Sequence, residues 1–282
     1  MSATVSEFLP ASAPTRASSN FQAAWNAFWS LVLRDILVTW RELISFLIQV
    51  ILQPMFMLFI MGRVLPGMGE MSAGFGTILL PGILAFTVFL TALQGVSFVL
   101  ILDLGYSREI EDRLLAPLPI SMVAIEKVLV AMLRGWLSGI FLFPLAWWIL
   151  GNSFQVRTDM LGGLIAMVIL TSMVGAALGL VLGTAVQPEQ IGIVFGLVLT
   201  PLIFTGCVYN PWGTINIQWF KIVALFNPLT YVSEGLRATM LPASMSHAIP
   251  TLGMGWILLV VGVSFVVFLA IGMRTFRSRV VS

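Results

Sequence analysis

A short run of charged side chains is the part of this sequence best suited to bind another protein. Five charges fall within six positions, at Arg108, Glu109, Glu111, Asp112 and Arg113. The run is too short to fold as a domain, and the prolines that follow at positions 117 and 119 would stop a helix and turn the chain. A compact surface of mixed charge is typical of a docking element. The alternative is a solvated turn without a partner.

Three other ionisable side chains lie within or near long apolar stretches, where an unpaired charge is costly. Arg134 is the clearest case, and we predict that it pairs with Asp103 or extends toward the cytoplasmic surface. The competing interpretation is that Arg134 lines a path and attracts an anionic head group. Glu234 and Arg237 stand one helical turn apart, so they can form a structural ion pair or contact a polar head of a cargo.

The sequence contains no motif for catalysis. A Gly-x-x-x-x-Gly-Lys stretch is absent, so this chain does not hydrolyse ATP. His247 and Cys207 are the only residues of their types, too few for a zinc or haem site of the usual kind. No pair of carboxylates within the apolar stretches indicates acid–base chemistry. We therefore expect neither an enzyme nor a cofactor bound by this chain.

The elements that must position these side chains are membrane spans. The 282 residues are 59% hydrophobic and 9% charged, with a mean hydropathy of +1.03, whereas soluble domains carry about 25% charged residues. A span needs roughly 20 apolar residues, and lipid offers no partner to an unpaired backbone amide. We therefore predict an all-α integral membrane protein with six transmembrane helices. They cover residues 43–64, 75–102, 124–150, 160–186, 191–209 and 251–273.

The distribution of Lys and Arg predicts that both termini lie in the cytoplasm. In that orientation the inner flanks hold eight basic residues, Arg34, Arg41, Arg108, Arg113, Lys127, Arg274, Arg277 and Arg279. The outer flanks hold four, Arg63, Arg157, Lys221 and Arg237. This basic inner rim accounts for the net charge of +2, so no nucleic-acid partner is needed to explain it.

The chain before the first span divides into two parts. Residues 1–18 are rich in Ser, Ala, Pro and Thr, which predicts a disordered cytoplasmic tail. Residues 20–41 alternate apolar and polar side chains at helical spacing, which predicts an amphipathic interface helix in the cytoplasmic membrane surface. This helix either only anchors the first span or also meets a cytoplasmic partner through its polar face, which includes Arg34 and Arg41.

Several motifs, in order and spacing, resemble the permease subunits of type 2 ATP-binding-cassette exporters across about residues 20–274. They are Pro81-Gly82, the cluster from Arg108 to Arg113, Leu114-Leu115-Ala116-Pro117-Leu118-Pro119-Ile120-Ser121, a Gln-Pro-Glu-Gln turn at 187–190, a Thr-Gly-Cys-Val-Tyr-Asn-Pro segment ending at Pro211, and Asn227-Pro228-Leu229-Thr230-Tyr231 followed by Glu234 and Arg237. Where the family often has Glu-Arg-Gly-Thr before the leucine pair, this chain has Glu109-Ile110-Glu111-Asp112-Arg113, which keeps the charge and lacks the glycine.

The resemblance implies a half-transporter. Two six-span permeases, a second copy or a homologous permease, face each other in the cell's inner or plasma membrane among its lipids. Two separate ATPase subunits, which bind ATP and magnesium, sit on their cytoplasmic side. The family's interface helix and the helix after its second span contact those ATPases, so residues 108–113 would form a coupling helix, with Arg34 and Arg41 as further contacts.

The resemblance also assigns roles to two other regions. Residues 211–242 would form two short re-entrant helices before the last span, with Asn227 and Pro228 beginning the second. The residues that define this region are Asn227, Pro228, Tyr231, Glu234 and Arg237. The family builds its dimer interface and translocation pathway from the second and fifth spans. The candidates for that pathway are Phe86, Phe89, Gln94, Phe98, Phe195, Thr200 and Phe204, together with Arg134; ordinary packing is the alternative for each.

The cargo follows least directly from the sequence. Many aromatic and methionine side chains favour a hydrophobic or amphipathic compound, such as a drug-like natural product or a lipid, moved out of the cytoplasm or inner leaflet. Export of a lipid-linked polysaccharide by the same machinery is the alternative. A stand-alone secondary carrier ranks lower, because carriers normally show internal repeats with broken helices in both halves.

Overall fold

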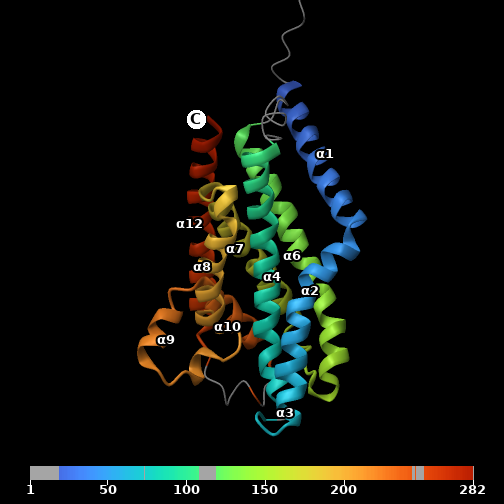
Figure 1. The fold of residues 1–282 in the computed structure, drawn as a ribbon, viewed down its shortest axis with the longest axis vertical. Helices are drawn as coiled ribbons and strands as arrows, with labels where there is room; N and C mark the ends of the chain where they lie inside the picture. The colour runs from blue at the N-terminus through green and yellow to red at the C-terminus, as the bar shows by residue number, and fades with distance from the viewer. Residues whose placement is uncertain (1–18, 73, 108–118, 243–244, 246–250, 282) are drawn as a thin grey trace, which may run out of the picture.

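The computed structural model describes residues 19–72, 74–107, 119–242, 245 and 251–281. The predicted tail at 1–18 therefore lies outside the described residues. Every regular element within them is helical (Figure 1). The main helices are α1 (Ser19–Arg41), α2 (Leu43–Phe59), α4 (Phe75–Leu102), α6 (Ile120–Leu150), α7 (Leu161–Ala185), α8 (Ile191–Thr205), α9 (Gln218–Ala224), α10 (Pro228–Met240) and α12 (Met254–Val281). Shorter turns are η1 (Ile60–Val64), α3 (Leu65–Gly67), η2 (Asp103–Ser107), η3 (Gly151–Ser153), η4 (Pro188–Gln190) and η5 (Trp212–Thr214).

The six predicted spans are confirmed. Among the described residues, six helical segments are long and apolar enough to cross a membrane. The second span, predicted at 75–102, coincides with α4. The last helix continues beyond the predicted end at 273 to Val281, and there Arg279 Nη1 donates to the carbonyl of Thr184 at 2.7 Å. A cationic side chain on the last carbonyls of a neighbouring helix stabilises both ends, which explains the extension.

The fifth span is shorter than predicted. The prediction ended at residue 209, whereas α8 ends at Thr205. Cys207 has a backbone φ of 52°, in the left-handed region that a continuing right-handed helix cannot use. An apolar sequence alone therefore overestimated this span, because Val208 and Tyr209 are apolar residues of the loop that follows.

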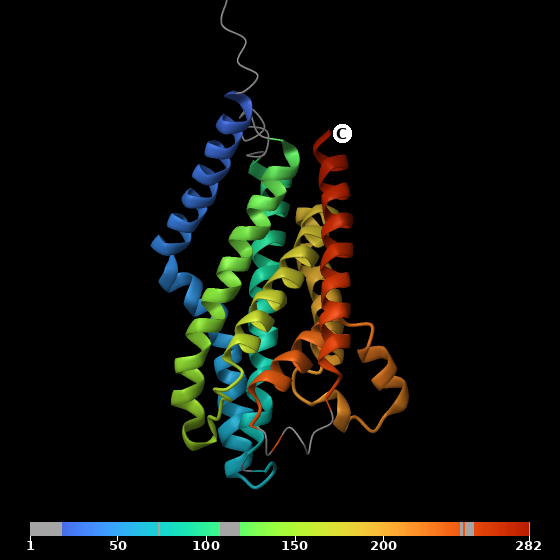
Figure 2. The same ribbon diagram turned by 180° about the vertical axis from the view of Figure 1, so that it is seen from behind.

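The core is built around α4. Of the most apolar part of this span 72% is buried, against 11% for the corresponding parts of the first, fifth and sixth spans. Both views show α4 inside the bundle with α6 and α7 beside it (Figures 1 and 2). A Cβ atom added at Gly175 or Gly179 of α7 would collide with the carbonyl oxygens of Phe89 or Leu93 of α4. These small residues therefore allow the backbones of α7 and α4 to approach closely.

Helix α1 packs obliquely along α6 (Figures 1 and 2). Phe28 and Val32 form a small apolar cluster with Val130 of α6. The helix is amphipathic, as predicted, and its buried face lies against protein, while Trp25, Trp29 and other apolar side chains remain exposed. How α1 lies relative to a membrane surface stays a prediction.

The beginning of α1 and the end of α12 lie at the same end of the bundle (Figures 1 and 2). The end of η2 and the beginning of α6, which flank residues 108–118, lie at that end as well (Figure 1). Even numbers of crossings return a chain to the side from which it started, so this arrangement agrees with six spans. The short helices α9 and α10 lie toward the opposite end (Figure 2).

Candidate functional site

The predicted coupling residues Arg108, Glu109, Glu111, Asp112 and Arg113 lie outside the described residues. The two further coupling candidates are on α1. Arg34 is exposed, and its Nε lies 3.9 Å from Asp35 Oδ1. Arg41, in the last turn of α1, is also exposed. Both cations are therefore accessible at the surface of the interface helix.

Polar contacts fix the inner face of α1 to α6. Lys127 Nζ donates to Asp35 Oδ2 at 2.7 Å, and both side chains are largely buried. In place of the predicted pairing of Arg134 with Asp103, Arg134 Nε donates to Thr39 Oγ1 at 2.9 Å. The sequence analysis did not identify Asp35 and Thr39, although their four-residue spacing puts them on one helix face. These contacts join segments 92 and 95 residues apart in the chain.

Arg134 receives no direct carboxylate partner within the described residues, but its surroundings are acidic. The carboxylates whose charges act on its guanidinium are Asp35, Glu42 and Glu126. This local balance of charge explains how an arginine is held within a span. It also reduces the attraction that Arg134 could exert on an anionic cargo.

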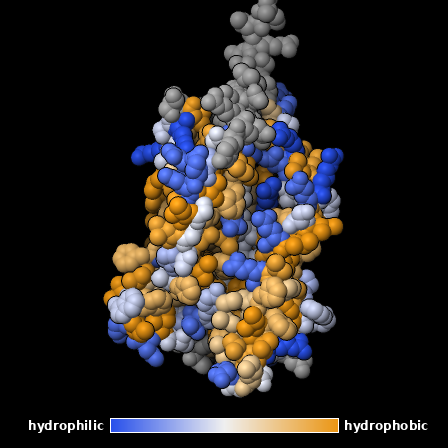
Figure 3. Space-filling model, in the orientation of Figure 1, coloured by the Kyte–Doolittle hydropathy of each residue, from blue (hydrophilic) through white to orange (hydrophobic). Residues whose placement is uncertain are grey.

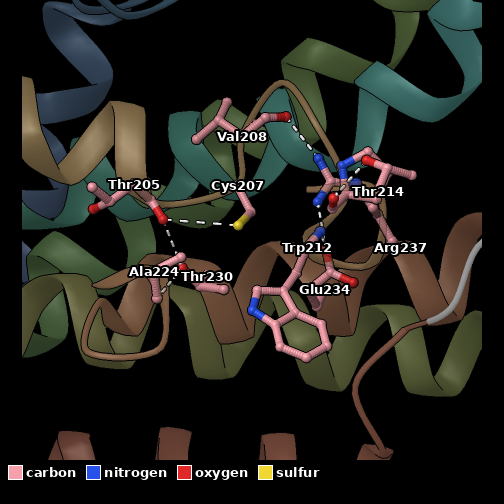
Figure 4. Close-up of polar contacts among 10 residues, drawn as sticks. Thr205, Cys207, Val208, Trp212, Thr214, Ala224, Thr230, Glu234 and Arg237 are labelled. Atoms are coloured by element: carbon pink, nitrogen blue, oxygen red, sulfur yellow. Dashed lines mark hydrogen bonds and ion pairs between the residues drawn. The ribbon is translucent and has the colours of Figure 1, made fainter. Parts of the chain in front are cut away.

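A second polar cluster lies in the predicted re-entrant region (Figure 4). Arg237 Nη1 donates to Glu234 Oε1 at 2.8 Å, and both side chains of this α10 pair are fully buried. The predicted ion pair is therefore confirmed. The same guanidinium donates through Nη2 to the carbonyl of Val208 at 2.8 Å. Glu234 Oε1 also accepts from the backbone amide of Trp212 at 2.9 Å, so the pair holds the loop after α8 onto α10.

Gly82, in the Pro81-Gly82 motif of α4, packs directly against this cluster. A Cβ atom at Gly82 of α4 would collide with the carbonyl of Val208 and would lie 2.6 Å from Arg237 Nη2. Glycine is therefore required sterically, because the loop carbonyl and the guanidinium occupy the space of a side chain. The Pro-Gly motif that the sequence analysis singled out thus serves the Glu234–Arg237 pair.

The predicted start of the second short helix is also confirmed. Asn227 Oδ1 accepts from the amide of Leu229 at 2.9 Å, and Pro228 occupies the first turn. Asn227 Nδ2 donates to the carbonyl of Leu202 at 2.7 Å, which ties the cap to the end of α8. Tyr231 OH donates to the carbonyl of Leu225 at 2.9 Å. These side chains therefore hold the start of α10 against the ends of α8 and α9.

Cys207 lies at the centre of the same loop and is buried (Figure 4). Burial raises the pKa of its thiol to about 11, and the nearby Glu234 carboxylate acts in the same direction. A thiol with this pKa stays protonated at neutral pH and is a poor nucleophile. Its role is packing.

The candidates for the translocation pathway are separated into different places. Phe98 of α4 stacks on Phe195 of α8 with ring centroids 4.7 Å apart. Phe89 is fully buried in the core and presents no ring to a surface. Arg134 bonds Thr39 of α1, and its side chain also lies beside Gly95 of α4. Thr200 and Phe204 are exposed on α8.

Two candidates, Phe86 and Gln94, line a groove between α2 and α4. The groove also includes Gln49 and Gln53 of α2, which the sequence analysis did not select. The sequence did contain a signal for them, because two glutamines four residues apart lie on one helix face within an otherwise apolar span.

The fold defines a multi-pass helical membrane protein with one polar cluster between α1 and α6, a second around α10, and three spans that are largely exposed. The family model of the ABC-2 type transporter matches residues 26–241, which is more than half of the chain. The chain therefore belongs to the ABC-2 type transporter family and is a membrane-spanning permease component of an ABC transporter, without the ATPase. Such a permease associates with ABC ATPase partners. A search of curated proteins found no match.

Proposed function

We propose that this permease is half of an ATP-driven exporter in the plasma membrane, with both of its termini in the cytoplasm. Two permeases, either two copies or this chain and a homologous one, face each other, and two ATPase subunits bind on their cytoplasmic side. Those subunits hold ATP and magnesium. The cargo is a hydrophobic or amphipathic compound, drug-like or lipid, that leaves the cytoplasm or the inner leaflet.

The observation that carries this proposal is the family match over residues 26–241 in a chain whose sequence has no nucleotide-binding motif. A permease of this family without its own motor takes its energy from a separate chain. That chain must grip hydrophilic groups outside the lipid, since apolar surface in a bilayer offers no directional contact.

The location of basic residues supports the proposed orientation. The pairing of Arg237 with Glu234 removes one of the four cations assigned to the outer flanks. The remaining three are Arg63, Arg157 and Lys221, and Arg157 is already neutralised by Asp159 at 2.7 Å. At the end with both termini Lys127 is likewise paired, with Asp35, so these pairings leave in place the excess of basic residues that the sequence count indicated at that end.

Contacts between α1 and α6 support a route for coupling. Helix α6 begins directly after residues 108–118, which include the proposed coupling charges. Lys127 lies two turns into α6 and holds Asp35 of α1. A movement of residues 108–113 would therefore act on α6 and, through this ion pair, on α1, so that the two elements respond together.

Charge reversal tests the proposed coupling helix. Glu111→Lys combined with Arg113→Glu should abolish transport-linked ATP turnover of the purified permease–ATPase complex in proteoliposomes while leaving membrane insertion intact. The matched control is Arg157→Glu with Asp159→Lys, a reversal at the opposite end that should leave turnover unchanged. Unchanged turnover in the first variant would remove residues 108–113 from the mechanism.

A cargo panel tests the substrate class in the same proteoliposomes. Stimulation of ATP turnover by drug-like amphiphiles or by lipids supports the proposal, whereas stimulation by lipid-linked glycan polymer alone would favour the polysaccharide exporter. A permease that transports without any ATPase would be a secondary carrier.

A further inference from the structure

An amide-lined groove interrupts the apolar surface of α2 and α4. It has a volume of about 170 Å³, and its polar lining consists of Gln49 and Gln53 of α2 with Thr87, Thr91 and Gln94 of α4. Hydrophilic atoms are visible at mid-height of this face, where α4 and α2 run side by side, within a mainly hydrophobic surface (Figures 1 and 3). The groove lies along two spans and shares no lining residue with the polar clusters described above.

The three glutamines of this groove have unused hydrogen-bonding groups. Thr87 and Thr91 donate their hydroxyls to the carbonyls of Ile83 and Thr87 in their own helix. By contrast, none of the three glutamine amides forms a hydrogen bond with any part of the chain that the structure describes. Each primary amide offers two donors and a carbonyl acceptor, so the groove presents a dense set of both kinds.

Pure lipid tails are an unfavourable neighbour for these amides. An unpaired amide in a medium that cannot hydrogen-bond costs roughly 2–7 kcal/mol. Gln53 is the eleventh residue of a 25-residue span, so it lies close to the middle of the span and cannot reach either surface. Something that hydrogen-bonds must therefore occupy or face the groove when the protein is in its membrane.

We propose that this groove binds the uncharged, hydroxyl- or amide-bearing head of an amphipathic cargo. The lining contains amides, hydroxyls and apolar side chains and no charged residue, so a charged head group would be desolvated there without a counter-charge. Drug-sized ligand pockets are about 300–1,000 Å³, so a groove of about 170 Å³ suits a head group or a single ring and not a whole molecule.

The surface beside the groove suits the apolar remainder of such a molecule. Ile48, Leu52 and Phe56 of α2 are exposed large apolar side chains next to the two glutamines in sequence. A tail lying along them would stay in contact with lipid while the head is held by amides. This inference rests on the proposed function, since it names the chemistry of the cargo that the exporter would carry.

Leucine substitution separates a binding groove from a lipid-facing one. The intact permease–ATPase complex is titrated with monoglucosyl-diacylglycerol, whose sugar head is uncharged, and with phosphatidylglycerol of the same acyl chains, and binding is followed by native mass spectrometry. Gln49→Leu/Gln53→Leu/Gln94→Leu should weaken glucolipid binding by about tenfold or more and leave phosphatidylglycerol binding unchanged, because each lost hydrogen bond weakens binding by roughly two- to tenfold. Gln190→Leu, an exposed glutamine outside the groove, is the matched control.

The opposite binding results would overturn the inference. Equal glucolipid binding by the triple variant and wild type, or equal binding of both lipids by wild type, would exclude a head-group site. Loss of the permease dimer in the same spectra would show that the groove faces the second permease.

If the triple variant does not fold, Gln53→Leu alone should weaken glucolipid binding by about threefold, and no change would overturn the inference. A wild-type complex that lacks its ATPase or ATP turnover would instead refute the proposed function.

Discussion

Two of the buried ion pairs in the described part of this permease, Glu234–Arg237 and Asp35–Lys127, are built differently. Glu234 and Arg237 belong to one helix, are fully buried and carry two further hydrogen bonds to the loop after α8. Asp35 and Lys127 belong to two helices and keep a small exposed fraction, 13% and 5% of their side chains. The first pair closes a loop onto a helix inside the bundle. The second joins an outer helix to the bundle near the proposed ATPase side.

The difference between the pairs indicates which parts of the molecule can move. A pair within one helix keeps its geometry when that helix moves, and its contacts to Val208 and Trp212 tie the loop after α8 to α10. An ion pair between two helices can transmit a movement of one helix to the other, or it can break, since each partner is anchored in a separate element. We expect stability to depend mainly on the first pair and coupling to ATP on the second.

Removing the cation of the fully buried pair should have the largest effect. Arg237→Leu leaves the Glu234 carboxylate buried without its partner, and we expect a loss of about 3–5 kcal/mol in the free energy of unfolding. Thermal unfolding of the purified protein in detergent measures the change. The double variant Glu234→Gln/Arg237→Leu carries no charge at this site and should be more stable than Arg237→Leu alone. A double variant as unstable as the single would show that the helix needs this charge pair itself.

The glycine beneath the same pair gives the next largest effect. Gly82→Ala should destabilise the protein by up to about 3 kcal/mol, because the new methyl group would meet the carbonyl of Val208. Gly196→Ala on α8 is the matched control, since a Cβ atom there meets nothing within 4 Å. The control should be as stable as wild type or more, because alanine favours helix. Equal unfolding temperatures for both variants would contradict the packing argument.

The pair between helices should contribute less to stability and more to coupling. A double-mutant cycle of Asp35→Asn and Lys127→Met should give an interaction energy of about 1 kcal/mol in unfolding, with a larger proportional loss of transport-linked ATP turnover. The exchanged pair, Asp35→Lys with Lys127→Asp, should recover part of that turnover. If each variant lost ATP turnover only in proportion to its loss of stability, the pair would have a structural role only.

The smallest effect is expected at the exposed pair Arg157–Asp159, on the loop before α7. The hydrogen bond from the Arg157 guanidinium lowers the pKa of the Asp159 carboxyl. A carboxyl whose pKa is lowered in the folded state stabilises the protein at pH values above its ordinary pKa. That stabilisation disappears as the pH falls through the folded-state pKa. Asp159→Asn should therefore be slightly less stable than wild type at pH 7, and the difference should shrink below about pH 4. A difference that grows on acidification would contradict this sign.

Much of the fold could be predicted because lipid imposes a simple rule on the sequence. Apolar runs of span length identified all six membrane helices, and the second was placed to the residue as α4. The cap at Asn227 and the pair Glu234–Arg237 also followed, since both are local features set by spacings of two and three residues. The end of α8 was misplaced, because hydropathy does not register the backbone turn at Cys207.

Long-range contacts could not be predicted from spacing. Arg134 bonds Thr39 and Lys127 bonds Asp35 because the folded chain places α6 alongside α1. Nothing in the sequence distances of 95 and 92 residues indicates those partners. The pathway candidates, chosen by helix, were separated for the same reason, with Phe89 in the core and Phe204 on the surface.

The sequence by itself determined that this protein crosses the membrane six times, that it carries no nucleotide-binding motif and where its local caps and ion pair form, because hydropathy and helical spacing act over a few residues. Only the tertiary structure decided that Gly82 must leave room for Val208 and Arg237, which side chain holds Arg134, and that Gln49, Gln53 and Gln94 share one groove. These depend on which helix faces meet, and that is settled by packing across the whole bundle.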